Sequence, residues 1–139
     1  MQQRDYLLRE IEKIGMMLRA IRQKLIGGSD DLKITSRDRI EVAKEMLFNE
    51  MNFDLDNFLT LNQEESVEKI KSVEGLSEEN LDYLAECIAH IGFMDESGKS
   101  ETILHKALYL YDYSSKESRT FSFDREQKIA EIKNRLNMT

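Results

Sequence analysis

The 139-residue chain contains no proline, no tryptophan and only six glycines. Proline and glycine are the residues that most disfavour a helix interior, so little in this sequence interrupts a helix. No apolar run approaches the roughly 20 residues of a membrane-spanning helix. Arg9 and Glu10 interrupt the first apolar run, so no signal-peptide pattern fits. These absences predict a helical protein without a transmembrane segment, and they favour a cytoplasmic location by default.

Cysteine and histidine are scarce as well. Cys87 is the only cysteine, so the chain cannot form an internal disulfide, which agrees with a reducing compartment. His90 follows three residues later on the same helical turn, so the two side chains are candidate metal ligands. A structural zinc site needs four ligands, and only His105 and Glu86 are candidates to complete it. We favour a buried, inert Cys87 and a His90 at the edge of the core.

No other group of residues predicts chemistry. Segment 92–100 resembles a phosphate-binding loop, but five residues instead of four separate its glycines, Gly92 and Gly98, and a helix rather than a strand precedes it. Neither histidine has a glutamate three residues before it, which a four-helix di-iron site requires. We therefore expect a protein that is not an enzyme and that carries no cofactor and no metal.

Charge is distributed unevenly along the chain. Residues 1–28 carry six basic and three acidic side chains, a net charge of +3, whereas residues 29–139 carry a net charge of −10. The acidic remainder disfavours nucleic acid, whose binding depends on neutralised phosphates. Anionic lipid and an acidic partner are two candidates for contact with the basic N-terminal part. We favour contact with the chain's own acidic remainder, so peripheral membrane contact is the weaker alternative.

A long amphipathic helix is predicted from about Gln3 to Ile26. Its apolar residues recur alternately four and three positions apart, at Leu7, Ile11, Ile14, Leu18, Ile21 and Leu25. This seam is typical of a helix that packs along another helix. Gly27-Gly28 should end the helix, because glycine tolerates the left-handed conformation that follows many helices. We interpret residues 1–139 as a single all-helical domain in which residues 1–28 are joined to the body by a hinge at Gly27-Gly28.

The remaining helices are expected to begin at residues that favour helix N-termini: near Thr35, at Asn62, at Ser77, at Ser100 and at Ser122. A short continuation is expected after Asn52 or Asp54. Ser114-Ser115 is predicted to end one helix, and Phe121 and Phe123 are predicted to fill the junction before the last one. No stretch alternates in the manner of a strand. We therefore predict an all-α fold of five to six helices, packed as an antiparallel helical bundle.

The predicted helix pair from about Leu81 to Asp112 resembles a tetratricopeptide-type (TPR-like) helical hairpin. With Ala107 at the family's alanine, the large apolar positions of the repeat fall on Leu84, Ile91 and Leu104. The sequence departs from the family at Ile88, Ser100 and Asp112, where two small residues and a proline are usual. The resemblance covers about a quarter of the chain and implies stacked helix pairs with a partner-binding role. The long N-terminal helix is also similar to the start of small uncharacterised bacterial helical proteins.

Two functional hypotheses follow. The first is a non-catalytic protein-protein interaction or scaffold module that self-associates, as a homodimer, through the seam residues Leu7, Ile11, Ile14, Leu18, Ile21 and Leu25. The alternative is a small-molecule or peptide sensor with an inter-helix pocket near the densest run of aromatic and methionine residues: Phe48, Met51, Phe53 and Phe58. The first helix either folds back onto its own body or pairs with another chain, and the regular seam favours the second arrangement.

Overall fold

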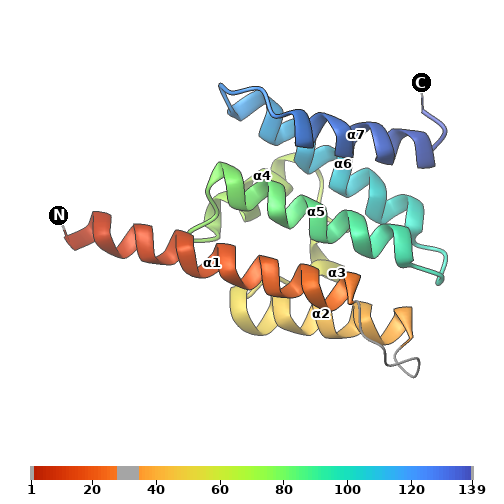
Figure 1. The fold of residues 1–139 in the computed structure, drawn as a ribbon, viewed down its shortest axis with the longest axis horizontal. Helices are drawn as coiled ribbons and strands as arrows, with labels where there is room; N and C mark the ends of the chain where they lie inside the picture. The colour runs from red at the N-terminus through yellow and green to blue at the C-terminus, as the bar shows by residue number, and fades with distance from the viewer. Residues whose placement is uncertain (1, 28–34, 139) are drawn as a thin grey trace.

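Seven helices make up the part of the chain that the computed structural model describes, residues 2–27 and 35–138 (Figure 1). They are α1 (Gln2–Ile26), α2 (Ser36–Met51), α3 (Leu55–Phe58), α4 (Gln63–Ser72), α5 (Glu78–Met94), α6 (Ser100–Glu117) and α7 (Phe123–Arg135). These residues contain no β-strand, so the all-α prediction is confirmed. The described residues form seven helices, whereas five to six were predicted. The difference arises because the segment after Asp54 forms the separate four-residue helix α3.

Local hydrogen bonds account for most of the helix starts. Four predicted N-cap side chains accept a hydrogen bond from the backbone N–H three residues later: Thr35, Asn62, Ser77 and Ser122. Ser100 is different, because its hydroxyl donates to the carbonyl oxygen of Gly92 at 2.6 Å. The predicted cap at Ser100 is therefore wrong, and that hydroxyl instead joins the end of α5 to the start of α6.

Two further predictions around α6 are wrong. This helix does not end at Ser114-Ser115 but continues to Glu117. The Ser114 hydroxyl donates to Asp82 Oδ1 of α5 at 2.7 Å, so it has a partner outside the helix and does not compete for the helix's own backbone. Phe121 and Phe123 do not fill a junction, because their side chains are 78% and 76% exposed.

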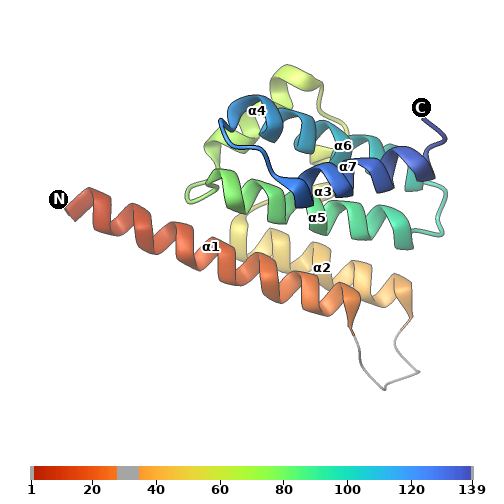
Figure 2. The same ribbon diagram turned by 45° about the horizontal axis from the view of Figure 1, so that its top comes forward.

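Several helices that follow one another in the chain pack side by side. Figures 1 and 2 show α1 and α2, α5 and α6, and α6 and α7 as neighbours that run in opposite directions. The helices α1 and α5 also lie side by side, but they run in the same direction. The central element is α5, which packs against α1, α2, α6 and α7. The N-terminal part of α1 extends beyond the other helices.

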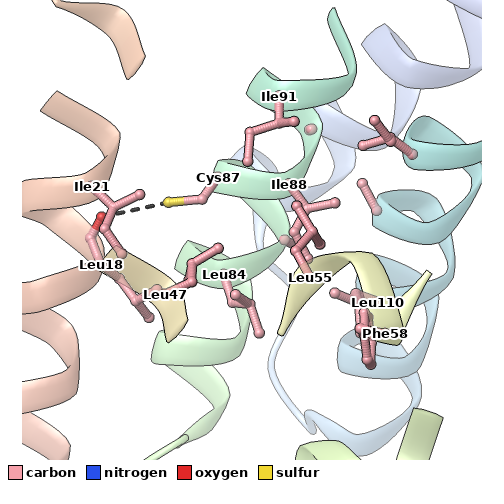
Figure 3. Close-up of a cluster of buried hydrophobic side chains, with 14 of the residues drawn as sticks. Leu18, Ile21, Leu47, Leu55, Phe58, Leu84, Cys87, Ile88, Ile91 and Leu110 are labelled. Carbon is pink, nitrogen blue, oxygen red and sulfur yellow. Dashed lines mark hydrogen bonds between the residues drawn. The ribbon is translucent and has the colours of Figure 1, made fainter. Parts of the chain in front are cut away.

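Most of the predicted seam of α1 is buried inside the chain's own core. Ile14, Leu18, Ile21 and Leu25 are at most 4% exposed. Figure 3 shows Leu18 and Ile21 facing side chains of α2 and α5, among them Leu47 and Cys87. Of the two arrangements that the sequence left open, this part of α1 therefore adopts the first and packs on its own body.

The end of α1 lies at the predicted position. Gly27 has a φ of +43°, in the left-handed region that glycine favours, and its N–H donates to the carbonyl oxygen of Gln23. The Arg39 side chain of α2 donates to the last helical carbonyl, that of Ile26, at 3.3 Å. Gly28, the second residue of the predicted hinge, lies outside the described residues.

A buried amide joins α5 to α1. Asn80, which is 3% exposed, donates from Nδ2 to the carbonyl oxygens of Ile11 and Gly75, both at 2.8 Å. Gly75 has a φ of +84°, and a Cβ there would lie 2.6 Å from the carbonyl oxygen of Glu10. The turn before α5 therefore lies directly against the backbone of α1, and glycine is required at that point.

The basic C-terminal half of α1 meets acidic and aromatic side chains of α5. Arg22 Nε lies 3.0 Å from Glu86 Oε1. The N–H of Arg22 Nε does not point at that carboxylate, so the contact is an ion pair without a hydrogen bond. The Arg19 guanidinium lies over the Tyr83 ring, 5.6 Å from its centroid. The predicted contact between the basic helix and the acidic body is thus present at Arg22.

Within residues 2–27 and 35–138, no helix combines the length and the apolar character that crossing a membrane requires.

We expect Asn80→Ala to lower the free energy of unfolding by about 1–3 kcal/mol, because the two hydrogen bonds from Asn80 to the carbonyl oxygens of Ile11 and Gly75 are lost. Urea unfolding followed by circular dichroism measures the change. Asn49→Ala, at an exposed position of α2, is the matched control, because it makes the same substitution in a helix away from the core. Equal stability of the two variants would contradict a joining role for Asn80.

Candidate functional site

The structure separates the six predicted interface residues into two groups. Ile14, Leu18, Ile21 and Leu25 lie in the core. Leu7 is 46% exposed and Ile11 is half-buried, although both belong to the same seam. What α1 leaves free for a partner is therefore the N-terminal end of the seam, not the whole of it.

We call residues 3–13 the N-terminal segment of α1. It exposes three neighbouring apolar side chains: Tyr6, Leu7 and Leu8 are 48%, 46% and 55% exposed. The Tyr6 hydroxyl donates to Glu74 Oε2 at 3.3 Å. The carboxylates of Glu10 and Glu74 raise the pKa of that hydroxyl. Three basic and three acidic residues give the segment no net charge.

Most of the residues proposed to line a sensor pocket belong to the hydrophobic core. Phe48 is 54% exposed, whereas Met51, Phe53 and Phe58 are buried. The rings of Phe53 and Phe58 contact each other with centroids 4.9 Å apart. Three of the four side chains therefore form core packing, and the sensor hypothesis stays a prediction without an observed pocket of that lining.

Cys87 is a core residue, as expected from the sequence. It is fully buried, and its thiol donates to the carbonyl oxygen of Leu18 at 3.5 Å (Figure 3). Burial raises the pKa of the thiol to about 12, with a further increase from Glu86 that Arg22 opposes. At neutral pH the thiol is protonated, which is the less nucleophilic form.

The two histidines occupy different environments. His90 is half-buried, and burial lowers its pKa against the opposite effect of Glu86. His105 is exposed. Among the described residues, no three histidine, cysteine, aspartate or glutamate side chains are grouped so that they could hold a metal ion.

The segment that resembles a phosphate-binding loop is a turn organised by Asp95. Its carboxylate accepts hydrogen bonds from the backbone N–H of Ser97 at 3.2 Å, the backbone N–H of Lys99 at 2.9 Å and the Ser97 hydroxyl at 2.8 Å. Burial alone would raise the pKa of Asp95, but these hydrogen bonds outweigh it and the pKa is lowered. The N–H groups that would bind a phosphate are therefore already bound to a carboxylate.

That turn forms one wall of a cleft about 580 Å³ in volume, which also involves α2 and α3. Buried Ile40, Ile91 and Ile103 form its floor. At its edge Lys44 pairs with Asp56 at 3.1 Å. Opposite charges on the rim thus neutralise one another, and the cleft has no dominant sign of charge to select a ligand.

A partly buried polar cluster joins α5, α6 and α7. Asp82 accepts hydrogen bonds from Arg125 Nε at 3.2 Å, from Arg125 Nη2 at 3.1 Å and from the Ser114 hydroxyl at 2.7 Å. Arg125 is only 6% exposed. The sequence does not single out this pair, although Arg125 lies four residues before Ile129 and hence on the apolar face of α7. A basic residue on an apolar stripe is the signal that predicts a buried partner.

A second set of charges joins α1, α5 and α7. Glu86 of α5 lies 3.0 Å from Arg22 of α1 and 3.5 Å from Lys128 of α7. Helices α5 and α7 therefore meet twice through charged groups, at Asp82 and at Glu86. The protein thus directs several of its own cations to one acidic face of α5.

Comparisons with models of known protein families, with curated proteins and with solved structures find nothing that matches this chain. The resemblance to tetratricopeptide hairpins therefore stays an expectation, and function has to be argued from the surfaces described above.

We expect native Cys87 not to react with a thiol reagent such as Ellman's reagent in mildly alkaline buffer, and to react at once in denaturing guanidinium chloride. The reason is that both burial and protonation protect it. Rapid modification of the native protein would show that α5 does not hold Cys87 in the core.

The same thiol should make stability depend on alkaline pH. The pKa of Cys87 rises from 9.0 to about 12 on folding, so its contribution is complete below pH 9 and is lost as the pH rises towards about 12. Cys87→Ala should flatten this decline, measured as the free energy of unfolding against pH. An unchanged slope in the variant would assign the decline to other groups.

Proposed function

We propose that this protein is a non-catalytic protein-protein interaction module that self-associates, as a homodimer, through the N-terminal segment of α1. One observation carries the proposal: the apolar seam continues past the end of the body that buries it. Leu7 and Ile11 lie on the same face as Ile14, but only Ile14 is fully covered. Covering such side chains gains roughly 25 cal/mol for each Å² removed from water.

Charge favours a second copy at this surface. Two bodies with a net charge of −10 over residues 29–139 repel each other. The N-terminal segment has no net charge and extends beyond the other helices (Figures 1 and 2). Pairing through this segment therefore buries apolar surface while it keeps the acidic bodies apart.

We also propose that the helices form TPR-like hairpins, and their arrangement supports this. The pairs α1–α2 and α5–α6 each run antiparallel, and the first helices of the two pairs, α1 and α5, lie side by side in the same direction (Figure 1). Stacked helical hairpins have this arrangement. We interpret α7 as a closing helix, and α3 and α4 as an insertion between the two pairs. We place the module in the cytoplasm on its composition alone.

We expect the wild-type chain to have twice the monomer mass by size exclusion with light scattering, and Leu7→Glu to have the monomer mass. A buried charge in each copy at the interface opposes pairing. Met16→Glu is the matched control, because it adds the same charge at an exposed position of α1 that lies outside the N-terminal segment.

Point substitutions are preferable to removal of residues 1–28, because that deletion would take four buried side chains out of the core. Circular dichroism should show equal helix content in all three proteins. A monomeric wild type at high concentration, or equal masses for the two variants, would contradict self-association through this segment.

A further inference from the structure

The start of α7 closes a small cleft against α5 and α6, with a volume of about 190 Å³. The cleft is lined by four carboxylates, two tyrosines, one serine and one arginine: Glu79, Asp82, Glu86, Asp124, Tyr83, Tyr111, Ser122 and Arg125. The volume suits the tip of a side chain or a small organic molecule, and it is below the usual range for larger ligands.

The protein's own cations neutralise only part of this lining. Arg125 pairs with Asp82, and Arg22 and Lys128 pair with Glu86. Asp124 has no ion pair or hydrogen bond with any described side chain. Glu79 has no cation within the described residues and accepts one long hydrogen bond, from the Tyr83 hydroxyl at 3.4 Å. Two carboxylates are therefore left without a positive partner.

Tyr111 supplies a second, independent observation. Its side chain is 98% buried, at 2% relative exposure. Its hydroxyl makes no hydrogen bond with another described group, and it is not one of the fully buried unpaired atoms, so it is open to the cleft that Tyr111 lines. Tyrosine hydroxyls in such positions usually have a hydrogen-bond partner, and a ligand in the cleft can take the place of solvent at this one. Burial raises the pKa of Tyr111, and the carboxylates of Glu86, Asp82 and Asp124 raise it further. The hydroxyl thus lies in a negative potential, where it would accept a hydrogen bond from a cation.

We propose that this cleft binds a primary ammonium or guanidinium group, which donates hydrogen bonds to the Asp124 carboxylate and the Tyr111 hydroxyl. The charge selects a cation, the small volume selects a narrow head group, and the unpartnered hydroxyl supplies an acceptor inside the cleft. We do not propose a metal ion as the ligand, because no three histidine, cysteine, aspartate or glutamate side chains among the described residues are placed to hold one.

Two carriers have this chemistry: a lysine or arginine side chain of a partner protein, and a free small amine. Phe121 and Phe123 flank Ser122 at the edge of the cleft, and both are more than three-quarters exposed. They offer apolar contact to the neighbours of a basic side chain, which a free amine lacks. The site does not depend on the proposed homodimer, because none of its lining residues belongs to α1.

The test is a titration of ¹⁵N-labelled protein, followed by NMR, with n-butylammonium chloride and with a short capped peptide that has one lysine between two leucines. We expect saturable shifts at the amides of Tyr111 and Asp124. n-Butanol, which has the same apolar body without the charge, and potassium chloride at equal ionic strength should produce none. A peptide that binds about tenfold more tightly than the amine identifies a protein partner, and equal affinities identify a free amine.

Variants test whether the cation binds in this cleft and thereby causes the amide shifts. Asp124→Asn should weaken binding about tenfold, because it removes the uncompensated carboxylate. Tyr111→Phe keeps the buried ring and should weaken binding through the loss of the acceptor alone. Asp112→Asn, an exposed carboxylate elsewhere on α6, is the control for net charge. Shifts that potassium chloride reproduces, or that Asp124→Asn leaves unchanged, would overturn the proposal.

Discussion

Burial of the apolar face of α1 between α2 and α5 is the interaction on which the rest of the structure depends. Leu18 and Ile21 are fully buried there, and each such side chain contributes roughly 1.5–3 kcal/mol relative to exposure. This burial brings α5 against a helix about 70 residues earlier in the chain, as the contact of Cys87 with Leu18 shows. Helices α6 and α7 also pack against α5, so their positions depend on the way α5 lies on α1.

At one end of the interface between α1 and α5, the backbone of α1 lies directly against the turn before α5. This contact marks the last point at which the other helices cover α1. Asn80 holds the carbonyl oxygens of Ile11 and Gly75 together, and Gly75 leaves no room for a side chain against Glu10. Residues of α1 before this point pass the turn and have no helix of the body beside them. The same contact that fixes α5 on α1 therefore leaves Leu7 uncovered, and a structural constraint produces the surface that we propose for self-association.

Features that depend on neighbouring residues could be predicted from the sequence, and features that depend on distant ones could not. Ser77 caps α5 through a bond three residues away, so the local sequence suffices to find it. The seam of α1 identifies the buried face, but a periodic pattern does not name the neighbour that covers it. Ser114 illustrates the limit: its partner Asp82 is 32 residues away, and that bond lets α6 continue where two serines predict its end. Phe121 shows the converse error, in which an apolar residue was assumed to be buried.

The anionic cleft exists only while α7 is docked, because α7 supplies Asp124 and Arg125 whereas α5 and α6 supply Asp82 and Tyr111. Buried Ile129 and Ile132 attach α7 to the core, and ion pairs add to this contact. A largely buried ion pair such as Arg125 with Asp82 repays its desolvation only when its geometry is good. Ser114 completes that geometry from α6. A cation bound beside Asp124 would contact all three helices at once, and a ligand that binds only the docked form stabilises it in proportion to its occupancy. Binding in the cleft and attachment of α7 are therefore one coupled equilibrium.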